Sequence, residues 1–407
     1  MLSLHTGYDT AYLTVAVGGG QGADYYTGAE GEPPGYWQGA GARALGLAGQ
    51  IGGKDEAGKA SAEVMRRLYH EDVGPDGQVL ARRQRPGNYP AASGSLNARI
   101  EAEVAEQVAA RGGIITPEET REIRLRLRAQ FRNRVPFYDY TFSAPKSVSV
   151  LWASLLQAAA EAAAEGREAE AERLTEQAEQ IREAVKRAND RMIAVAEQRA
   201  AYIRTGHHSA TSGEYRDAAG FIVSSFPQHT NREGDPQLHV HNAIANRAQR
   251  ADGADDKWRA LHGQPLFKEK LGLGALGDRF LAQELEQLGW RTIRRADGNA
   301  LEVGGISEEA ADAFSGRAKE LRDRYRELAA QYERDHGHAP AKQAVWALKQ
   351  RAALETRDTK DHNPPAAGQE RAAWAQKAER RGAGKLSSFH WRAAIYATEH
   401  GPSEMPS

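Results

Sequence analysis

Alternating apolar and polar positions predict a pair of antiparallel strands in the second half of the chain. The segment LHVHNAI (residues 238–244) alternates with a period of two, and GFIVSSF (residues 220–226) is an apolar run of strand length. The polar stretch NREGD lies between them and is typical of a turn. We therefore expect a β-hairpin, in which side chains two residues apart project from one face.

Other segments predict further strands alternating with helices. Strands are expected at residues 1–7 and 137–142, and a second hairpin is expected to turn at Asp297-Gly298. Helical patterns cover residues 61–70, where Ser61 would be the N-cap, and residues 116–135, 151–203 (interrupted at Gly166), 268–289 and 307 onward. Together they predict an α+β fold, with a mostly antiparallel central sheet flanked by helices, a long helical insertion and a helical C-terminal region.

The amino-acid composition excludes some kinds of site and bears on location and on nucleic-acid binding. The 407 residues include no cysteine, which excludes disulfides, thiolate zinc sites and cysteine nucleophiles. No run of eighteen apolar residues and no signal-peptide pattern occurs, so a bacterial cytoplasmic location is expected. The net charge of −1 gives no overall signature of nucleic-acid binding, so any such binding must use local patches.

Two arginine-rich segments could form such patches. Residues 81–100 carry four arginines and no acid, and residues 111–134 carry seven arginines against three glutamates. A basic run can also be a solvated helix face. The arginines that we expect to contact phosphates are Arg82, Arg83, Arg85, Arg124 and Arg128.

Histidines concentrate in the predicted hairpin. His239 and His241 would share one strand face, and the hairpin would bring His229, or its neighbour Gln228, beside them. Three neutral ligands can hold a divalent ion and leave coordination positions open for a substrate oxygen. The plainer alternative is a pair of polar side chains on an exposed strand.

Three separate segments carry a family resemblance. They are an N-terminal cluster of tyrosines, YDYTFSAPKSVS (residues 138–149) and DPQLHVHNAI (residues 235–244). Together they resemble the relaxase domain of MobF-class conjugative DNA relaxases, in the HUH endonuclease superfamily. The similarity continues through KWRALHGQPLF, LAQELEQLGW and FSGRAKEL. It implies a ferredoxin-like palm in a relaxase domain spanning residues 1–325, followed by a helical extension at 326–407 that is partly flexible near 358–369.

The resemblance also implies an activity. A relaxase cuts one DNA strand at a plasmid origin of transfer by attack of a tyrosine hydroxyl on the scissile phosphate. The attack leaves a 5′-phosphotyrosine and a free 3′-hydroxyl, which later permit rejoining. Tyr12 matches the leading family tyrosine, and Tyr25 and Tyr26 form the one intact pair of tyrosines. Asp139 matches the position that hydrogen-bonds the metal site or the tyrosine and is assigned as base. The implied cofactor is Mg²⁺ or Mn²⁺, with Zn²⁺ as an alternative.

The third metal ligand departs from the family pattern. The usual spacing from the first to the second histidine is eleven positions, whereas His229 and His239 are ten apart. A gap-free alignment places Gln228 at the ligand position, in step with Phe226 on the strand. An imidazole is the better ligand, which favours His229, so both alternatives stay open.

Lys146 lies in SAPKS, at the expected start of a helix. Backbone amides at that position could hold a phosphate, with Lys146 as its counter-charge. A simple helix cap with a solvated lysine is the alternative.

The resemblance implies single-stranded and hairpin DNA, relaxosome accessory proteins and a type IV secretion coupling protein as partners. A rolling-circle initiator or transposase of the same superfamily, a catalytically weak origin-binding factor, and a zinc hydrolase are the competing functions. No HExxH motif supports the hydrolase, and no GxxxxGK[ST] predicts a P-loop ATPase within these residues.

Overall fold

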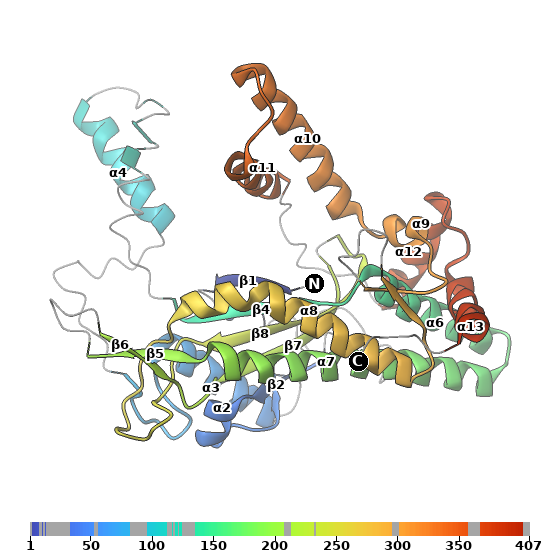
Figure 1. Cartoon of the computed structure of the whole chain (residues 1–407), viewed down its shortest axis with the longest axis horizontal. Helices are drawn as coiled ribbons and strands as arrows, with labels where there is room; N and C mark the ends of the chain where they lie inside the picture. Colours follow the sequence, from blue (N-terminus) through green and yellow to red (C-terminus); the bar gives the residue numbers. More distant parts are fainter. Residues whose placement is uncertain are drawn as a thin grey trace.

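The computed structural model has a six-stranded antiparallel sheet at its centre, in the order β1-β4-β8-β7-β2-β3 (Figure 1). The strands are β1 (Leu2–Gly7), β2 (Gly35–Gln38), β3 (Gln50–Ile51), β4 (Phe137–Ser143), β7 (Val223–Thr230) and β8 (Pro236–Ala245). The structure describes residues 2–7, 10, 13, 33–52, 56–81, 96–111, 116, 119–120, 122–123, 135–206, 213–231, 233–294, 301–356 and 367–401. The expected α+β fold and antiparallel sheet are therefore confirmed.

Long helices cover one face of the sheet. They are α6 (Lys146–Ala164), α7 (Glu168–Ala200) and α8 (Gly263–Gln287). Gly166, at a positive φ of 74°, allows the chain to reverse between α6 and α7, as the break in the helical pattern predicted. Apolar side chains of β4 and β8, including Phe142 and Val240, pack against these helices in the main hydrophobic core.

The C-terminal helices pack on the same core. They are α9 (Glu308–Ala313), α12 (Ala367–Arg380), the 3₁₀ helix η1 (Leu386–Ser388) and α13 (Phe389–His400). Trp374 and Phe389 are buried in the main cluster. Residue 325 lies inside α10 (Gly316–His336), and the packing of α12 and α13 links them to the sheet, so a division of the chain at 325 stays a proposal. Of the expected flexible segment, residues 358–366 lie outside the described residues.

A smaller layer covers part of the opposite face. Helices α2 (Ala40–Ala44) and α3 (Glu56–Glu71) contribute to a second cluster that contains Trp37, Tyr69 and Phe226. Helix α3 begins five residues before Ser61, so the expectation that Ser61 caps it was wrong. The Ser61 hydroxyl instead accepts a hydrogen bond from Trp37 Nε1 at 2.8 Å, a tertiary contact that local sequence does not reveal.

The remaining elements lie around this centre. They are α4 (Leu96–Arg111), the strand pair β5 (Tyr202–Thr205) and β6 (Glu214–Asp217), the pair β9 (Thr292–Arg294) and β10 (Leu301–Val303), and α11 (Lys342–Glu355). Helices α10 and α11 pack on each other and extend away from the sheet (Figure 1). Strands β9 and β10 form the second expected hairpin, although its turn lies outside the described residues.

Helix α6 is long and apolar enough to cross a membrane, and among the described helices it alone passes that test. About 72% of its apolar window is buried inside the protein, against α7, β8 and the C-terminal helices. We therefore interpret it as the core helix of a globular fold.

A buried polar network fixes β8 against the helical layer. Asn242 is fully buried and bonds Asn189 of α7 in both directions, at 2.7 and 3.0 Å. It also donates to the Tyr140 carbonyl and accepts from the Ser225 hydroxyl, both at 2.8 Å. Because both sides of the amide are satisfied, the network fixes how α7 and three neighbouring strands meet.

Substitution of Asn242 by alanine should therefore leave several buried polar groups without a partner. We expect a loss of about 3 kcal/mol in the free energy of unfolding, from roughly 1–3 kcal/mol for each unsatisfied group after partial relaxation. Urea denaturation measures it. Gln180→Ala, on the exposed side of α7, is the control and should change stability by no more than about 0.5 kcal/mol. Equal stability of the two variants would show that the network adds no net stability.

Candidate metal centre

Two histidines of β8 project from the face of the sheet opposite α6, α7 and α8, which is called the open face because α2 and α3 cover only part of it. Leu238 and Val240 are buried in the main core, so the alternate residues His239 and His241 point to the other side. Their ring centroids are 5.1 Å apart and the rings are nearly perpendicular. The expected pairing of the two imidazoles on one face is therefore present.

Each imidazole has its Nδ1 atom engaged by a neighbouring oxygen. His239 Nδ1 lies 2.8 Å from the carbonyl oxygen of Gln237. Because a carbonyl can only accept, Nδ1 must carry the proton and Nε2 must be the atom with the lone pair in the neutral ring. His241 Nδ1 lies 2.9 Å from Asp139 Oδ2, which favours the same tautomer.

Asp139 is the buried carboxylate of this arrangement. Its side chain is only 7% exposed, and β4 pairs it with Ala243, which is two residues from His241 along β8 and on the same face. Thr141 donates to the second oxygen of Asp139 at 3.3 Å and lies 3.1 Å from His241 Nδ1. The carboxylate therefore orients His241. Thr141 was not among the site residues predicted from the sequence, although strand alternation in DYTF places it on the same face as Asp139.

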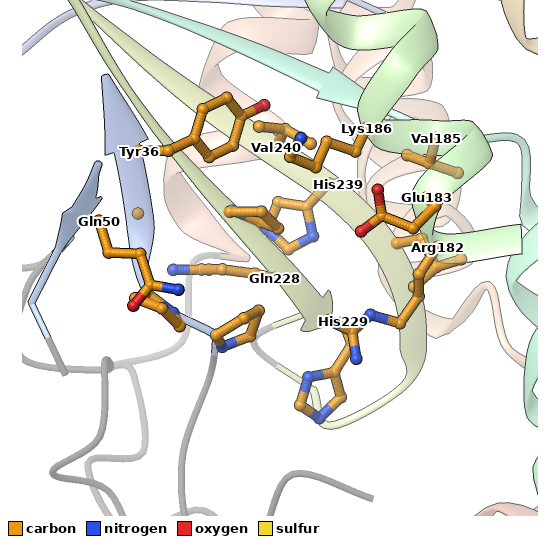
Figure 2. A pocket seen from close by; sticks show the side chains of 15 residues that line it. Tyr36, Gln50, Arg182, Glu183, Val185, Lys186, Gln228, His229, His239 and Val240 are labelled. Atoms are coloured by element: carbon orange, nitrogen blue, oxygen red, sulfur yellow. The ribbon is translucent and has the colours of Figure 1, made fainter. Parts of the chain in front are cut away.

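The neighbouring strand β7 brings Gln228 to the two histidines. Gln228 pairs directly with His239 in the β7–β8 register, and Phe226 pairs with His241. Figure 2 shows the Gln228 side chain beside the His239 ring. The strand pairing thus gives a face with two imidazoles and one amide.

His229 lies on the other side of the sheet. Its Nε2 is 3.4 Å from Glu370 Oε2 of α12, and its ring packs 5.7 Å from that of Trp152 in α6. In Figure 2 its imidazole points away from His239 and Gln228. The strand register therefore does not bring His229 together with the β8 histidines. This differs from the alternative in which His229, as the better type of ligand, lies beside them.

Lys146 occupies the first turn of α6, as expected, but its amine is directed at the hairpin. Its Nζ donates to the Pro236 carbonyl at 2.9 Å. Burial, together with the charge of Lys377, lowers the pKa of Lys146 to about 8 despite the opposing effect of Asp235. The amine thus contacts the tip of the β7–β8 hairpin and is not a simple solvated cap, while its pairing with a DNA phosphate stays a prediction.

A cavity of about 280 Å³ lies between β2, the β7–β8 hairpin and α7. Figure 2 shows Tyr36 and Lys186 at this cavity. The Tyr36 hydroxyl donates to Asp190 at 2.5 Å, and burial, reinforced by that carboxylate, raises the tyrosine pKa. Tyr36 therefore stays protonated, with its hydroxyl on the helical face, opposite the β8 histidines.

Several predicted residues lie outside the part of the chain that the structure describes. They are the candidate nucleophiles and arginines Tyr12, Tyr25, Tyr26, Arg82, Arg83, Arg85, Arg124 and Arg128. Their roles stay predictions. One further residue of the open face escaped the sequence reading: His5 is exposed and pairs with Asp139 across β1 and β4.

The antiparallel sheet with two histidines two residues apart on one strand face agrees with the HUH endonuclease class that the resemblance implied. Within that class, residues 6–381 match the family model of the TrwC relaxase. The chain belongs to the TrwC relaxase family, the MobF class of conjugative relaxases that the motifs had indicated.

Comparison with individual proteins agrees with this assignment. The chain is 28% identical over 290 residues to the multifunctional conjugation protein TraI of Escherichia coli (strain K12), which covers 67% of this chain but 14% of TraI. A copper-bound structure of the conjugative relaxase TrwC in complex with oriT DNA superposes with a TM-score of 0.57 at 24% identity, covering 94% of this chain and 99% of that one. TrwC complexed with a 27-mer DNA, comprising the recognition hairpin and the cleavage site, gives a TM-score of 0.56 at 25% identity with the same coverage.

Proposed function

We propose that this chain nicks one strand of DNA at a plasmid origin of transfer through a tyrosine nucleophile and later rejoins it during conjugation. Membership of the TrwC relaxase family supports the reaction class. The observation that carries the proposal is the pair of β8 imidazoles on the open face, with Asp139 behind His241 at 2.9 Å. The complexes of TrwC with oriT DNA support DNA as the substrate.

The open face fits a divalent metal ion. Both histidines would offer Nε2, because a neighbouring oxygen holds each Nδ1. Gln228 would add an amide oxygen, a harder ligand that suits Mg²⁺ or Mn²⁺ better than a third imidazole would. A bound ion would polarise the non-bridging oxygens of the scissile phosphate. The copper-bound and metal-free structures of TrwC support the use of a metal by this family, and we propose Mg²⁺ or Mn²⁺, with Zn²⁺ as an alternative.

The residues of this chain divide the remaining work. The hydroxyl of Tyr12, Tyr25 or Tyr26 would attack phosphorus and form a new P–O bond as the bond from phosphorus to the 3′-oxygen breaks. The phenol loses one proton and the 3′-oxygen gains one, so the reaction releases no net proton. Asp139 is already engaged with His241 and Thr141, so we propose that it positions the imidazole and does not deprotonate the tyrosine.

Other roles complete the proposal. The arginine segments at 82–85 and 121–134 would contact DNA phosphates, and relaxosome proteins and a type IV coupling protein would be partners in a bacterial cytoplasm. The chain spans 14% of the length of the TraI proteins that it matches, so activities of their remaining parts are not assigned to it.

DNA cutting should depend on a metal ion, because His239, His241 and Gln228 form the proposed set of metal ligands. Chelation should abolish cutting of a single-stranded oligonucleotide that carries the origin of transfer, and Mg²⁺ or Mn²⁺ should restore it. His239→Ala and His241→Ala should each remove most cutting but leave DNA binding nearly unchanged, because binding rests on other contacts. Gln228→Ala should weaken Mn²⁺ binding by about tenfold or more, and Gln228→His should tighten Zn²⁺ binding, both measured by calorimetry.

The matched control is Gln50→Ala. Gln50 is an exposed glutamine of β3 that lines the 280 Å³ cavity, as Gln228 does. This substitution should leave metal affinity unchanged. Undiminished cutting after thorough chelation would remove the metal from the proposal. Unchanged Mn²⁺ affinity in Gln228→Ala would remove only Gln228.

The nucleophile can be identified by removing single hydroxyl groups. Phenylalanine keeps the packing of the ring, so it separates chemistry from structure. Tyr12→Phe or Tyr25→Phe should abolish the covalent protein–DNA adduct seen on denaturing gels, and peptide mass mapping should find the 5′-phosphate on the same tyrosine. An adduct that persists in the triple variant of Tyr12, Tyr25 and Tyr26 would contradict all three assignments. Cutting without any adduct would contradict the relaxase mechanism itself, because water would then be the nucleophile.

A further inference from the structure

Gln228 and His239 pair with each other close to the tip of the β7–β8 hairpin. The register shifts between Gln228 and Thr230, where the strand pairing is irregular. Beyond it, the Asn231 side chain accepts hydrogen bonds from the backbone N–H groups of Glu233 and Asp235, both at 2.9 Å. A change in this tip would move the two strands that carry the proposed ligands relative to each other.

Helix α12 contacts this tip through one face. Glu370, Trp374 and Lys377 are spaced i, i+4 and i+7, so they lie on one side of the helix. Trp374 Nε1 donates to the Gly234 carbonyl at 2.7 Å, and Glu370 lies 3.4 Å from His229. Lys377 forms an ion pair with Asp235.

These contacts are buried. The Asp235 side chain is 1% exposed and that of Glu370 is 5% exposed. Lys377 donates to Oδ1 of Asp235, and among the described residues Oδ2 of Asp235 has no hydrogen-bond partner. A buried charge that loses its partner is strongly destabilising. Without α12, the tip could keep its present position only at a large cost in free energy.

A second layer supports the same arrangement. Trp152 of α6 packs against both His229 and Trp374, with ring centroids 5.7 Å apart in each case. Lys146, at the start of α6, donates to the Pro236 carbonyl at 2.9 Å. His229 is therefore part of the packing that joins the hairpin to α12.

We propose that α12 is a positioning element for the metal centre, with Lys377 and Trp374 as its positioning residues. Ligands must be held to within about half an ångström of the productive geometry, and a hairpin needs support outside its own strands to achieve this. Residues about 140 positions downstream would thus set the spacing between Gln228 and His239. This inference rests on the proposed metal site.

The test measures metal binding and hairpin opening in the intact chain without DNA. Lys377→Met removes the cation that is hydrogen-bonded to Asp235, so Mn²⁺ affinity, followed by electron paramagnetic resonance, should fall about tenfold or more. Amides of β7 and β8 near the tip should exchange hydrogen faster, while those of α7 stay protected. Trp374→Phe, which removes the N–H donor and part of the ring that packs on Trp152, should show a change in the same direction.

Three further variants separate positioning from general destabilisation. Lys377→Arg keeps the charge and should retain Mn²⁺ affinity close to that of the unmodified chain. Asp235→Asn combined with Lys377→Met should recover part of the loss, because no buried charge is left unpaired. Arg380→Met, at an exposed position of the same helix, should change neither measurement.

The outcomes distinguish this inference from the function on which it rests. If the unmodified chain binds Mn²⁺ and Lys377→Met binds it equally well with unchanged exchange in the hairpin, the role of α12 is refuted and the metal site stands. If the unmodified chain binds no Mn²⁺, both proposals fail.

Discussion

The hydrogen-bonded register of β8 between β4 and β7 is the constraint on which the site depends. Strand side chains alternate between faces, so a slip of one residue would move both histidines of β8 into the helical core and expose Leu238 and Val240. The same register places Thr141 across from His241 and Gln228 across from His239. His239 and His241 thus lie on the open face of the sheet because Leu238 and Val240 are buried on the helical face.

Hydrogen bonds from the helical layer stabilise this register. Asn242 follows His241 directly and points in the opposite direction, where it joins α7 to the sheet through fully satisfied hydrogen bonds. The outer end of the hairpin is held by Lys146 and by α12. Polar contacts on the buried side therefore fix the strands, while the exposed side is left for ligands.

Local patterns in the sequence could predict much of this arrangement. Alternation identified β8 and the paired histidines, and the break at Gly166 identified the α6–α7 hairpin. Residue type alone could not show which of Gln228 and His229 faces the β8 histidines, because that depends on strand pairing. Contacts distant in sequence, such as Trp37 with Ser61 or α12 with the hairpin tip, leave no local signal. The tyrosine assignments came from family resemblance, and those residues lie outside the described chain.

The central claim is that strand register selects the metal ligands. Anomalous scattering from crystals of the chain grown with Mn²⁺ would test it most directly. The account predicts one strong peak on the open face of the sheet, bonded to Nε2 of His239, Nε2 of His241 and the amide oxygen of Gln228. A peak bonded to His229 and Glu370 on the helical side, or no peak at the β8 histidines, would contradict it.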